Sequence, residues 1–263
     1  MKKRLIGFLA IGLLAFVGCD KEKQKGCTEP NAINYDSVAE ENDGSCKYSE
    51  TTEVKTDTDT DDGTTETLSD EAKDGDGNVY TSVKIGTQEW MVENLRTTRY
   101  SDGSLIPNVT NNTEWFNDTI GAWCHYDNGN LYETNFGKLY NWYAVETEKL
   151  CPTGWHVPTD DDWTVLTDYL GANGYSGSEG KALKSTLGWS SGGNGTDHYG
   201  WLGLPSGDRS SDGSFEGIGR VGIWWSSSEF NTSIAWYLGY SNVNLSSHYS
   251  SKKNGLSVRC LKD

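Results

Sequence analysis

The sequence predicts an α+β fold with an antiparallel sheet, and three patterns carry this prediction. Residues 78–92 alternate apolar and polar side chains around a Gly-Thr turn, which indicates a β-hairpin. Residues 159–170 change to helical spacing, and aromatic runs follow at 222–228, 234–240 and 255–261. The 31 Gly, 14 Tyr and 11 Trp among 263 residues favour an aromatic core joined by many turns over long helices.

The N-terminus has the pattern of an export signal. A basic start at residues 2–4 precedes an apolar run, 5–17, which is shorter than the ~20 residues that span a bilayer. The ending FVGC at 16–19 resembles the lipobox of bacterial lipoproteins. We therefore expect residues 1–18 to be a lipoprotein signal peptide. Cys19 would then be the lipidated N-terminus of segment 19–25, with the membrane as a partner.

Residues 26–48 form a small unit bounded by cysteines. It resembles a short module of secreted proteins from Bacteroidetes-type bacteria, and that resemblance implies a disulfide between Cys27 and Cys46. Asp36, Asn42 and Asp43 could supply hard oxygen ligands to calcium. The alternative is a disulfide-stapled loop whose polar residues only form turns.

Residues 49–75 are expected to be an acidic, disordered linker. Thr, Asp and Glu dominate this stretch and aromatic residues are missing, so it cannot bury enough apolar surface to offset its chain entropy. Like charges should extend it and hold the next domain away from the membrane. The formal net charge of -16 is concentrated before the folded domain and argues against nucleic acid as a partner.

The globular pattern is expected over 76–263. Its strand pair, 78–85 and 88–92, leads into a long irregular segment, 93–150. Thr159 can cap a helix through Asp162, Trp163, Leu166 and Leu170 repeat along one face, and Gly171 ends it. A second helix is expected over 179–187, between Ser178 and Gly188.

Several motifs in this region resemble one family. They are QEWMVENLR at 88–96, FGKLYNWYAV at 136–145, CPTGWHVPTDDDW at 151–163 and GLSVRCLKD at 255–263. In this order they look like the Fibrobacter succinogenes major paralogous domain (FISUMP), from about Asp76 to the C-terminus. The resemblance implies a C-type-lectin-like or formylglycine-generating-enzyme-like fold, with two short helices flanking a small twisted antiparallel sheet with long loops.

The resemblance also implies a disulfide. In the lectin-like arrangement a cysteine before the first helix pairs with one in the last strand, so Cys151 is expected to bond Cys260. With Cys19 lipidated and Cys27 paired with Cys46, Cys124 is the remaining thiol, expected to be buried and unreactive.

The sequence contains few candidate catalytic residues, and we therefore expect a protein that is not an enzyme and needs no cofactor. The four His residues are isolated in sequence, and the GIGRVG stretch at 217–222 precedes a strand, where a dinucleotide site needs a helix. The best candidates are aromatic, carboxylate and amide side chains in the late loops and strands, because stacked Trp with Asp or Asn is a common way to hold sugars. These ligand-binding candidates are Trp201, Asp208, Arg209, Trp224, Glu229, Trp236 and Asn242. The alternative for the Trp residues is the core, with Trp224 and Trp225 on opposite faces.

We therefore expect a lipid-anchored cell-envelope protein that displays a non-enzymatic binding or adhesion domain, for a glycan or a surface protein. Charged residues at 20–23 are similar to surface-export signals of Bacteroidetes and favour the outer membrane or cell surface. Two alternatives remain: a structural envelope protein without a small ligand, and an oxidoreductase similar to the formylglycine-generating enzymes. The second would be expected to use two nearby late cysteines, where this chain has only Cys260.

Overall fold

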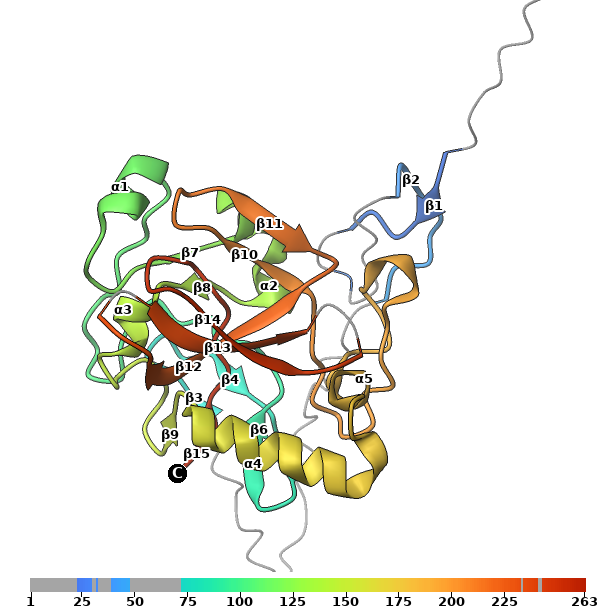
Figure 1. Ribbon diagram of the computed structural model, residues 1–263. Coiled ribbons are helices and arrows are strands. Elements are labelled where there is room, and N and C mark those ends of the chain that lie inside the picture. Colours follow the sequence, from blue (N-terminus) through green and yellow to red (C-terminus); the bar gives the residue numbers. More distant parts are fainter. Residues whose placement is uncertain (1–22, 30–31, 33–38, 48–71, 233, 241–242) are drawn as a thin grey trace, which may run out of the picture.

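The computed structural model describes residues 23–29, 32, 39–47, 72–232, 234–240 and 243–263, with the side chains of 191, 234–238 and 240 left out. It is a mixed α/β structure with few helices and several small sheets (Figure 1). The expected signal peptide, Cys19, Asp36, Asn242 and most of the expected linker lie outside the described residues. Within the described part of the chain, no helix combines the length and apolar character needed to cross a membrane.

The N-terminal unit holds the expected disulfide. Its strands β1 (Lys25–Gly26) and β2 (Glu41–Asn42) run parallel, with Lys25 opposite Glu41. Cys27 and Cys46 are bonded, with Cα atoms 4.8 Å apart. The disulfide therefore joins the segments beside both short strands.

Residues 72–75, which were expected to belong to the linker, are described as part of the folded domain. Strands β3 (Ala72–Lys73) and β4 (Val79–Tyr80) pair around a turn that the buried Asp74 organises. Its carboxylate accepts hydrogen bonds from the Asn78 amide at 2.9 Å and the Tyr80 hydroxyl at 2.6 Å. Because the strand is interrupted after Tyr80, Val79 is exposed and Tyr80 is buried, which breaks the expected alternation.

A four-stranded sheet joins both ends of the domain. Its order is β5–β6–β15–β9, formed by Ser82–Ile85, Gln88–Met91, Leu261–Lys262 and Trp155–His156. The disulfide between Cys151 and Cys260, with Cα atoms 6.0 Å apart, fixes the segment before β9 to the residue before β15. The expected strand at 255–261 is only partly formed, because Gly255, Leu256 and Ser257 each bridge a different segment.

The principal helix forms as the sequence predicts. Helix α4 (Asp160–Leu170) begins with a capping box between Thr159 and Asp162, and it buries Trp163, Leu166 and Leu170. A π-helical turn, η3 (Gly171–Tyr175), follows it. The next helix, α5 (Glu179–Leu183), is shorter than expected because Lys184 turns to extended backbone and bridges Gly203.

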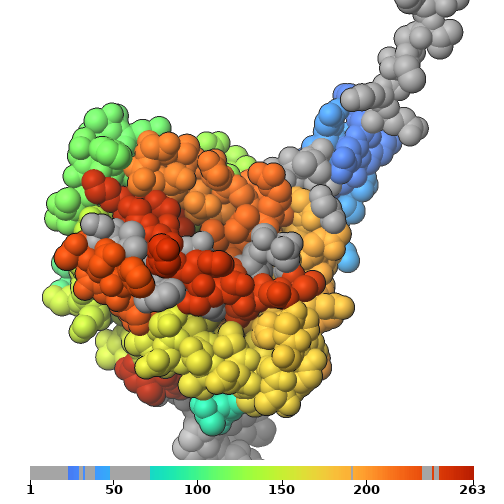
Figure 2. Space-filling view, viewed as in Figure 1, coloured from blue at the N-terminus to red at the C-terminus, as the bar shows by residue number. Residues whose placement is uncertain are grey.

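The late strands form a three-stranded antiparallel sheet, β12 (Gly222–Glu229), β13 (Ile234–Tyr240) and β14 (Ser246–Ser251). Strand β14 was not predicted, since its sequence SSHYSS is largely polar and exposed. The Ser247 hydroxyl donates to Asp160 at 2.9 Å, and Figure 2 shows α4 and these strands side by side on one face. The glycine stretch at 217–222 spans the end of β11, the turn at 219–221 and the first residue of β12, as its non-nucleotide interpretation predicts.

The other described elements are short. Strands β10 (Ser206–Arg209) and β11 (Phe215–Ile218) form a hairpin, and strands β7 (Trp123–Cys124) and β8 (Leu139–Tyr140) form another two-stranded sheet. The remaining short elements are helices α1 (Asn112–Asn117), α2 (Glu133–Phe136) and α3 (Trp142–Val145), with 3-10 turns η1 (Tyr126–Asn128), η2 (Asn130–Tyr132) and η4 (Ser190–Gly192). Most of the irregular segment is therefore shaped by turns.

Trp224 and Trp225 lie in different apolar cores, as alternation along a strand predicts. Trp225 packs with Tyr140, Leu256 and their neighbours. Trp224 belongs to a second core, here called the tryptophan core, which also contains Trp90, Trp163, Trp189 and Trp201. The rings of Trp201 and Trp224 meet edge to face with centroids 5.0 Å apart, a favourable geometry for two indoles.

A buried polar network crosses the tryptophan core and joins two of the family-like motifs. The side-chain oxygen of Asn94 accepts hydrogen bonds from Trp224 Nε1 at 2.8 Å and from Arg259 Nη2 at 2.7 Å. The guanidinium of Arg259 lies 3.9 Å from the Trp201 ring centroid and also donates to the Trp201 carbonyl. Asn94 thus satisfies an indole and a guanidinium that are both withdrawn from water.

Candidate functional site

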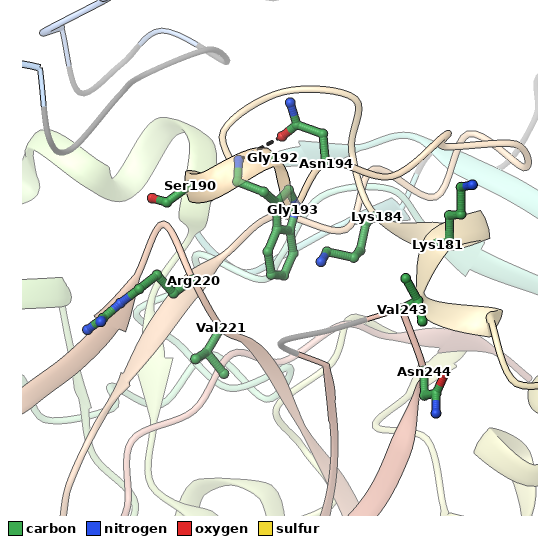
Figure 3. Close-up of a pocket in the computed structure, with 11 residues that line it drawn as sticks. Lys181, Lys184, Ser190, Gly192, Gly193, Asn194, Arg220, Val221, Val243 and Asn244 are labelled. Atoms are coloured by element: carbon green, nitrogen blue, oxygen red, sulfur yellow. Dashed lines mark hydrogen bonds between the residues drawn. The ribbon is translucent and has the colours of Figure 1, made fainter. Parts of the chain in front are cut away.

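A cavity of about 1060 Å³ lies between α5, η4, the turn before β12 and the residues before β14 (Figure 3). Its volume is in the range of small-molecule sites. The described residues that line it are Lys181, Lys184, Trp189, Ser190, Gly192, Gly193, Asn194, Arg220, Val221, Val243 and Asn244.

Backbone hydrogen bonds hold the walls of this cavity. The segment after η4 runs beside α5, with Gly195 N donating to Ser185 O and Thr196 N to Lys181 O. A Cβ atom at Gly195 would lie 2.3 Å from the Lys184 carbonyl oxygen, so only glycine permits this approach. Ser190 N donates to Gly219 O at 2.7 Å and ties η4 to the turn before β12.

Hydrogen bonds fix Trp189, which lines the cavity. Its indole Nε1 donates to the Ser185 hydroxyl at 3.2 Å and to the Gly203 carbonyl at 3.0 Å. Its backbone amide donates to the side-chain oxygen of Asn194 at 3.0 Å, the bond drawn in Figure 3. The ring is consequently held on several sides and presents a rigid face.

Lys184 places an ammonium group over that face. Its Nζ lies 3.8 Å from the Trp189 ring centroid, although only 2% of the residue is exposed. Burial lowers the pKa of Lys184 to about 8, because removal from water disfavours the charged form. The indole face offsets part of this cost through a cation–π contact.

The lining is positively charged. Lys184 reaches into the cavity, while the exposed Lys181 and Arg220 lie on opposite sides of it (Figure 3). None of the described lining residues carries a carboxylate. In a chain with a formal net charge of -16, this cavity has a local charge opposite to that of the whole protein.

Three of the sequence-predicted ligand contacts are core residues. Trp201, Arg209 and Trp224 are fully buried, so the expectation that they meet a ligand at the surface is corrected. The guanidinium of Arg209 donates to the carbonyls of Val109, Thr110 and Gly213, and it lies 4.3 Å from the Trp115 ring centroid. The guanidinium of Arg209 and the indole N–H of Trp224 thus support the fold, which sequence spacing alone could not distinguish from a binding surface.

The other candidates do not gather around the cavity. Asp208, in β10, lies opposite Glu216, and burial together with that carboxylate raises the pKa of Asp208 to about 6. Glu229, at the end of β12, forms an ion pair with Lys252, with Oε1 and Nζ 2.5 Å apart. The backbone of Trp236, in β13, pairs with that of Tyr249 in β14, but the structure does not describe the Trp236 side chain. Asn242 lies outside the described residues.

Glu229 lines a second cleft of about 710 Å³, beside α3 and β9. This cleft is acidic, since Glu146, Glu148 and Asp263 also line it. His156 bridges its edge, with ring nitrogens 2.7 Å from Asp263 and 3.4 Å from Asp162. The two cavities therefore present opposite charges to solvent.

The described residues of the expected calcium site form turns. The side-chain oxygen of Asn42 accepts from the Gly44 amide at 2.9 Å, and that of Asp43 from the Ser45 amide at 2.9 Å. The third residue, Asp36, lies outside the described chain. Among the residues that the structure describes, no group of three His, Cys, Asp or Glu side chains is arranged to hold a metal ion.

Cys124, in β7, is a free thiol with a buried side chain, as expected for the thiol that the other cysteine assignments leave over. Burial raises the pKa of Cys124 to about 11, which keeps the thiol protonated and poorly nucleophilic near neutral pH.

Sequence reasoning missed the residues of the first cavity. The predicted ligand contacts were tryptophans and polar or charged side chains of the late loops and strands. The cavity is instead lined by Trp189, by Lys181 and Lys184 at α5, and by Arg220 before β12. The available signal was the stretch GWSSGGNG at 188–195, since polar, glycine-rich loops on a rigid scaffold frequently carry function.

Comparison with known families gives one match. Residues 83–262 match the model of a family described as Fibrobacter succinogenes major domain. No curated protein and no solved structure matches the chain significantly.

Proposed function

The chain belongs to the Fibrobacter succinogenes major domain family, and on that premise we propose that this domain is a non-enzymatic binding module for glycans. The cavity beside Trp189 carries the proposal. It joins a rigid aromatic ring to hydroxyl, amide and ammonium groups from three segments. Sugar rings are commonly held by an aromatic wall with polar groups around it.

The proposal includes display at the cell envelope. The signal pattern of residues 1–18 and the lipobox-like Cys19 support export and lipid anchoring at the outer membrane or cell surface of a Bacteroidetes-like bacterium. The acidic stretch after the first disulfide unit would act as a spacer. A C-type-lectin-like arrangement is also part of the proposal, supported by the disulfide between the segment before α4 and the residue before β15.

The cysteines favour binding over thiol chemistry. Cys260 is bonded to Cys151, and the remaining described thiol, Cys124, is buried with a raised pKa. An oxidase similar to the formylglycine-generating enzymes would need accessible thiols that cycle between redox states.

A glycan array tests the proposed function. The chain from Asp20 to Asp263, labelled at its N-terminus, is applied with and without a chelator, and we expect reproducible binding to a limited set of glycans. Silence from correctly folded, disulfide-bonded protein in both conditions would refute glycan binding and favour a structural envelope role. A mass change in a cysteine peptide incubated with the protein and copper would favour the oxidase alternative.

A further inference from the structure

We infer that the cavity beside Trp189 receives the anionic group of an acidic saccharide, either a carboxylate or a sulfate ester. This inference rests on the proposed function and names the class of glycan. Three features of the cavity support it: its charge, the position of Lys184, and the polar groups among its lining residues.

The charge of the cavity selects an anion. Lys181, Lys184 and Arg220 line it from α5 and from the turn before β12, and its described lining contains no carboxylate. A concave site lined by one sign of charge concentrates its field and attracts the opposite charge. Because the formal net charge of the whole chain is -16, this field is a local feature of these two segments. The acidic second cleft would repel the same ligand.

Lys184 supplies the central contact. Its ammonium is 3.8 Å from the centroid of a fixed indole ring, and the residue is almost fully withdrawn from water. A charge-assisted hydrogen bond to a carboxylate or sulfate oxygen is stronger in such a place than at an exposed lysine. The anion would also stabilise the charged form of Lys184 and so oppose the effect of burial, which lowers the pKa of Lys184 to about 8.

The opening of the cavity suits a sugar. Ser190, Asn194 and Asn244 offer a hydroxyl and two amides beside the cations. The oxygen of Asn194 accepts from Trp189 N, and Figure 3 shows its nitrogen pointing away from that bond. Amides and hydroxyls that both donate and accept match the hydroxyl groups of a pyranose ring. An inorganic anion would pair with the cationic side chains, but the hydroxyl and the amides would still be hydrogen-bonded to water.

Calorimetric titration of the chain from Asp20 to Asp263 tests the ligand class. The probes are trigalacturonate for a carboxylate, a sulfated galactose trisaccharide for a sulfate ester, neutral galactotriose, and sodium sulfate for the anion alone. We expect at least one acidic trisaccharide to bind about tenfold or more tightly than the neutral one and than sodium sulfate, with affinity that falls as salt rises. The stronger acidic probe identifies the anion.

Matched variants assign the binding to this cavity. Lys184→Met keeps the aliphatic stem and removes the charge, and it should weaken the acidic probe about tenfold. Arg220→Gln, at an exposed position, should weaken it about threefold and reduce the salt dependence. The control Lys84→Gln removes one charge from an exposed site on β5 and should bind as the unmodified protein does.

The outcomes separate the two proposals. Equal binding of neutral and acidic trisaccharides, or unchanged affinity in both cavity variants, overturns the inference and leaves glycan binding standing. Binding of sodium sulfate as tight as that of the acidic sugars also overturns it. If no saccharide binds here or on the array, the proposed function fails together with the inference. If Lys184→Met loses its cooperative melting transition, Arg220→Gln and the salt titration decide the question.

Discussion

Replacing Asn94 by Leu should destabilise the domain strongly, because this one side chain serves several buried groups. Its oxygen is the acceptor for Trp224 Nε1 at 2.8 Å and for Arg259 at 2.7 and 3.2 Å. Its nitrogen donates to the Phe136 carbonyl at 3.0 Å. Leucine has the same branching and the same number of side-chain heavy atoms, so the change removes the hydrogen bonds while keeping the shape of the side chain similar.

The cost can be estimated from the groups left without a partner. A buried polar group that loses its hydrogen bond costs about 1–3 kcal/mol, and one that is charged costs more. In this variant Trp224 Nε1 loses Asn94 Oδ1 as its hydrogen-bond acceptor. Arg259 loses the same oxygen but still donates to the carbonyls of Trp201 and Leu202. We therefore expect Asn94→Leu to lower the free energy of unfolding by about 3–5 kcal/mol. This corresponds to a fall in Tm of roughly 10 °C for a domain of this size.

Urea titration followed by tryptophan fluorescence measures this loss under oxidising conditions. The matched control is Asn130→Leu, an exposed position where the same exchange should change stability by less than about 0.5 kcal/mol. A loss below about 1 kcal/mol in Asn94→Leu, with native near-UV circular dichroism, would refute the view that Asn94 satisfies the network.

Three further predictions concern the cysteines and one carboxylate. The double variant Cys151→Ala/Cys260→Ala should lose about 4–5 kcal/mol in urea titration, since the bond closes a separation of 109 residues, and a loss below about 1 kcal/mol would contradict this. Cys124 should resist iodoacetamide at pH 8 in the folded protein and react in urea, because its thiol is buried with a pKa raised to about 11, and rapid native alkylation would count against this burial. Burial raises the pKa of Asp208 to about 6, so the folded state favours the protonated acid, and its ionisation lowers stability as the pH rises through about 4 to 6. Asp208→Asn should therefore raise the free energy of unfolding by about 1–2 kcal/mol at pH 7 and leave it unchanged near pH 3, and equal effects at both pH values would contradict the raised pKa.

Local signals account for the elements that the sequence predicted correctly. The capping box at Thr159 and the apolar spacing of Trp163, Leu166 and Leu170 are contained within helix α4 itself. The Gly-Thr turn between β5 and β6 likewise needs only adjacent residues. Strand β14 was missed because its polar composition gives a weak strand signal, although its partner is the preceding strand, β13. The bridges of residues 255–257 were missed because their partners are distant in sequence.

The candidate site was poorly predicted because side-chain chemistry does not reveal burial. Arg209 was expected to meet a ligand, but it donates to three backbone carbonyls that only the fold brings around it. Lys184 was overlooked because a single lysine after a short helix gives no signal. Its position over Trp189 depends on the loop at 190–196, which returns beside α5.

The sequence by itself determined the family, the principal helix, the first hairpin and the tendency of Trp224 and Trp225 to face opposite cores. These properties depend on motif order and on the periodicity of neighbouring residues. Only the tertiary structure decided which cations remain around an accessible cavity and which arginines become buried supports. Both depend on contacts between segments far apart in the chain, and the energy of a charge is set by the water and the partners that those contacts remove or provide.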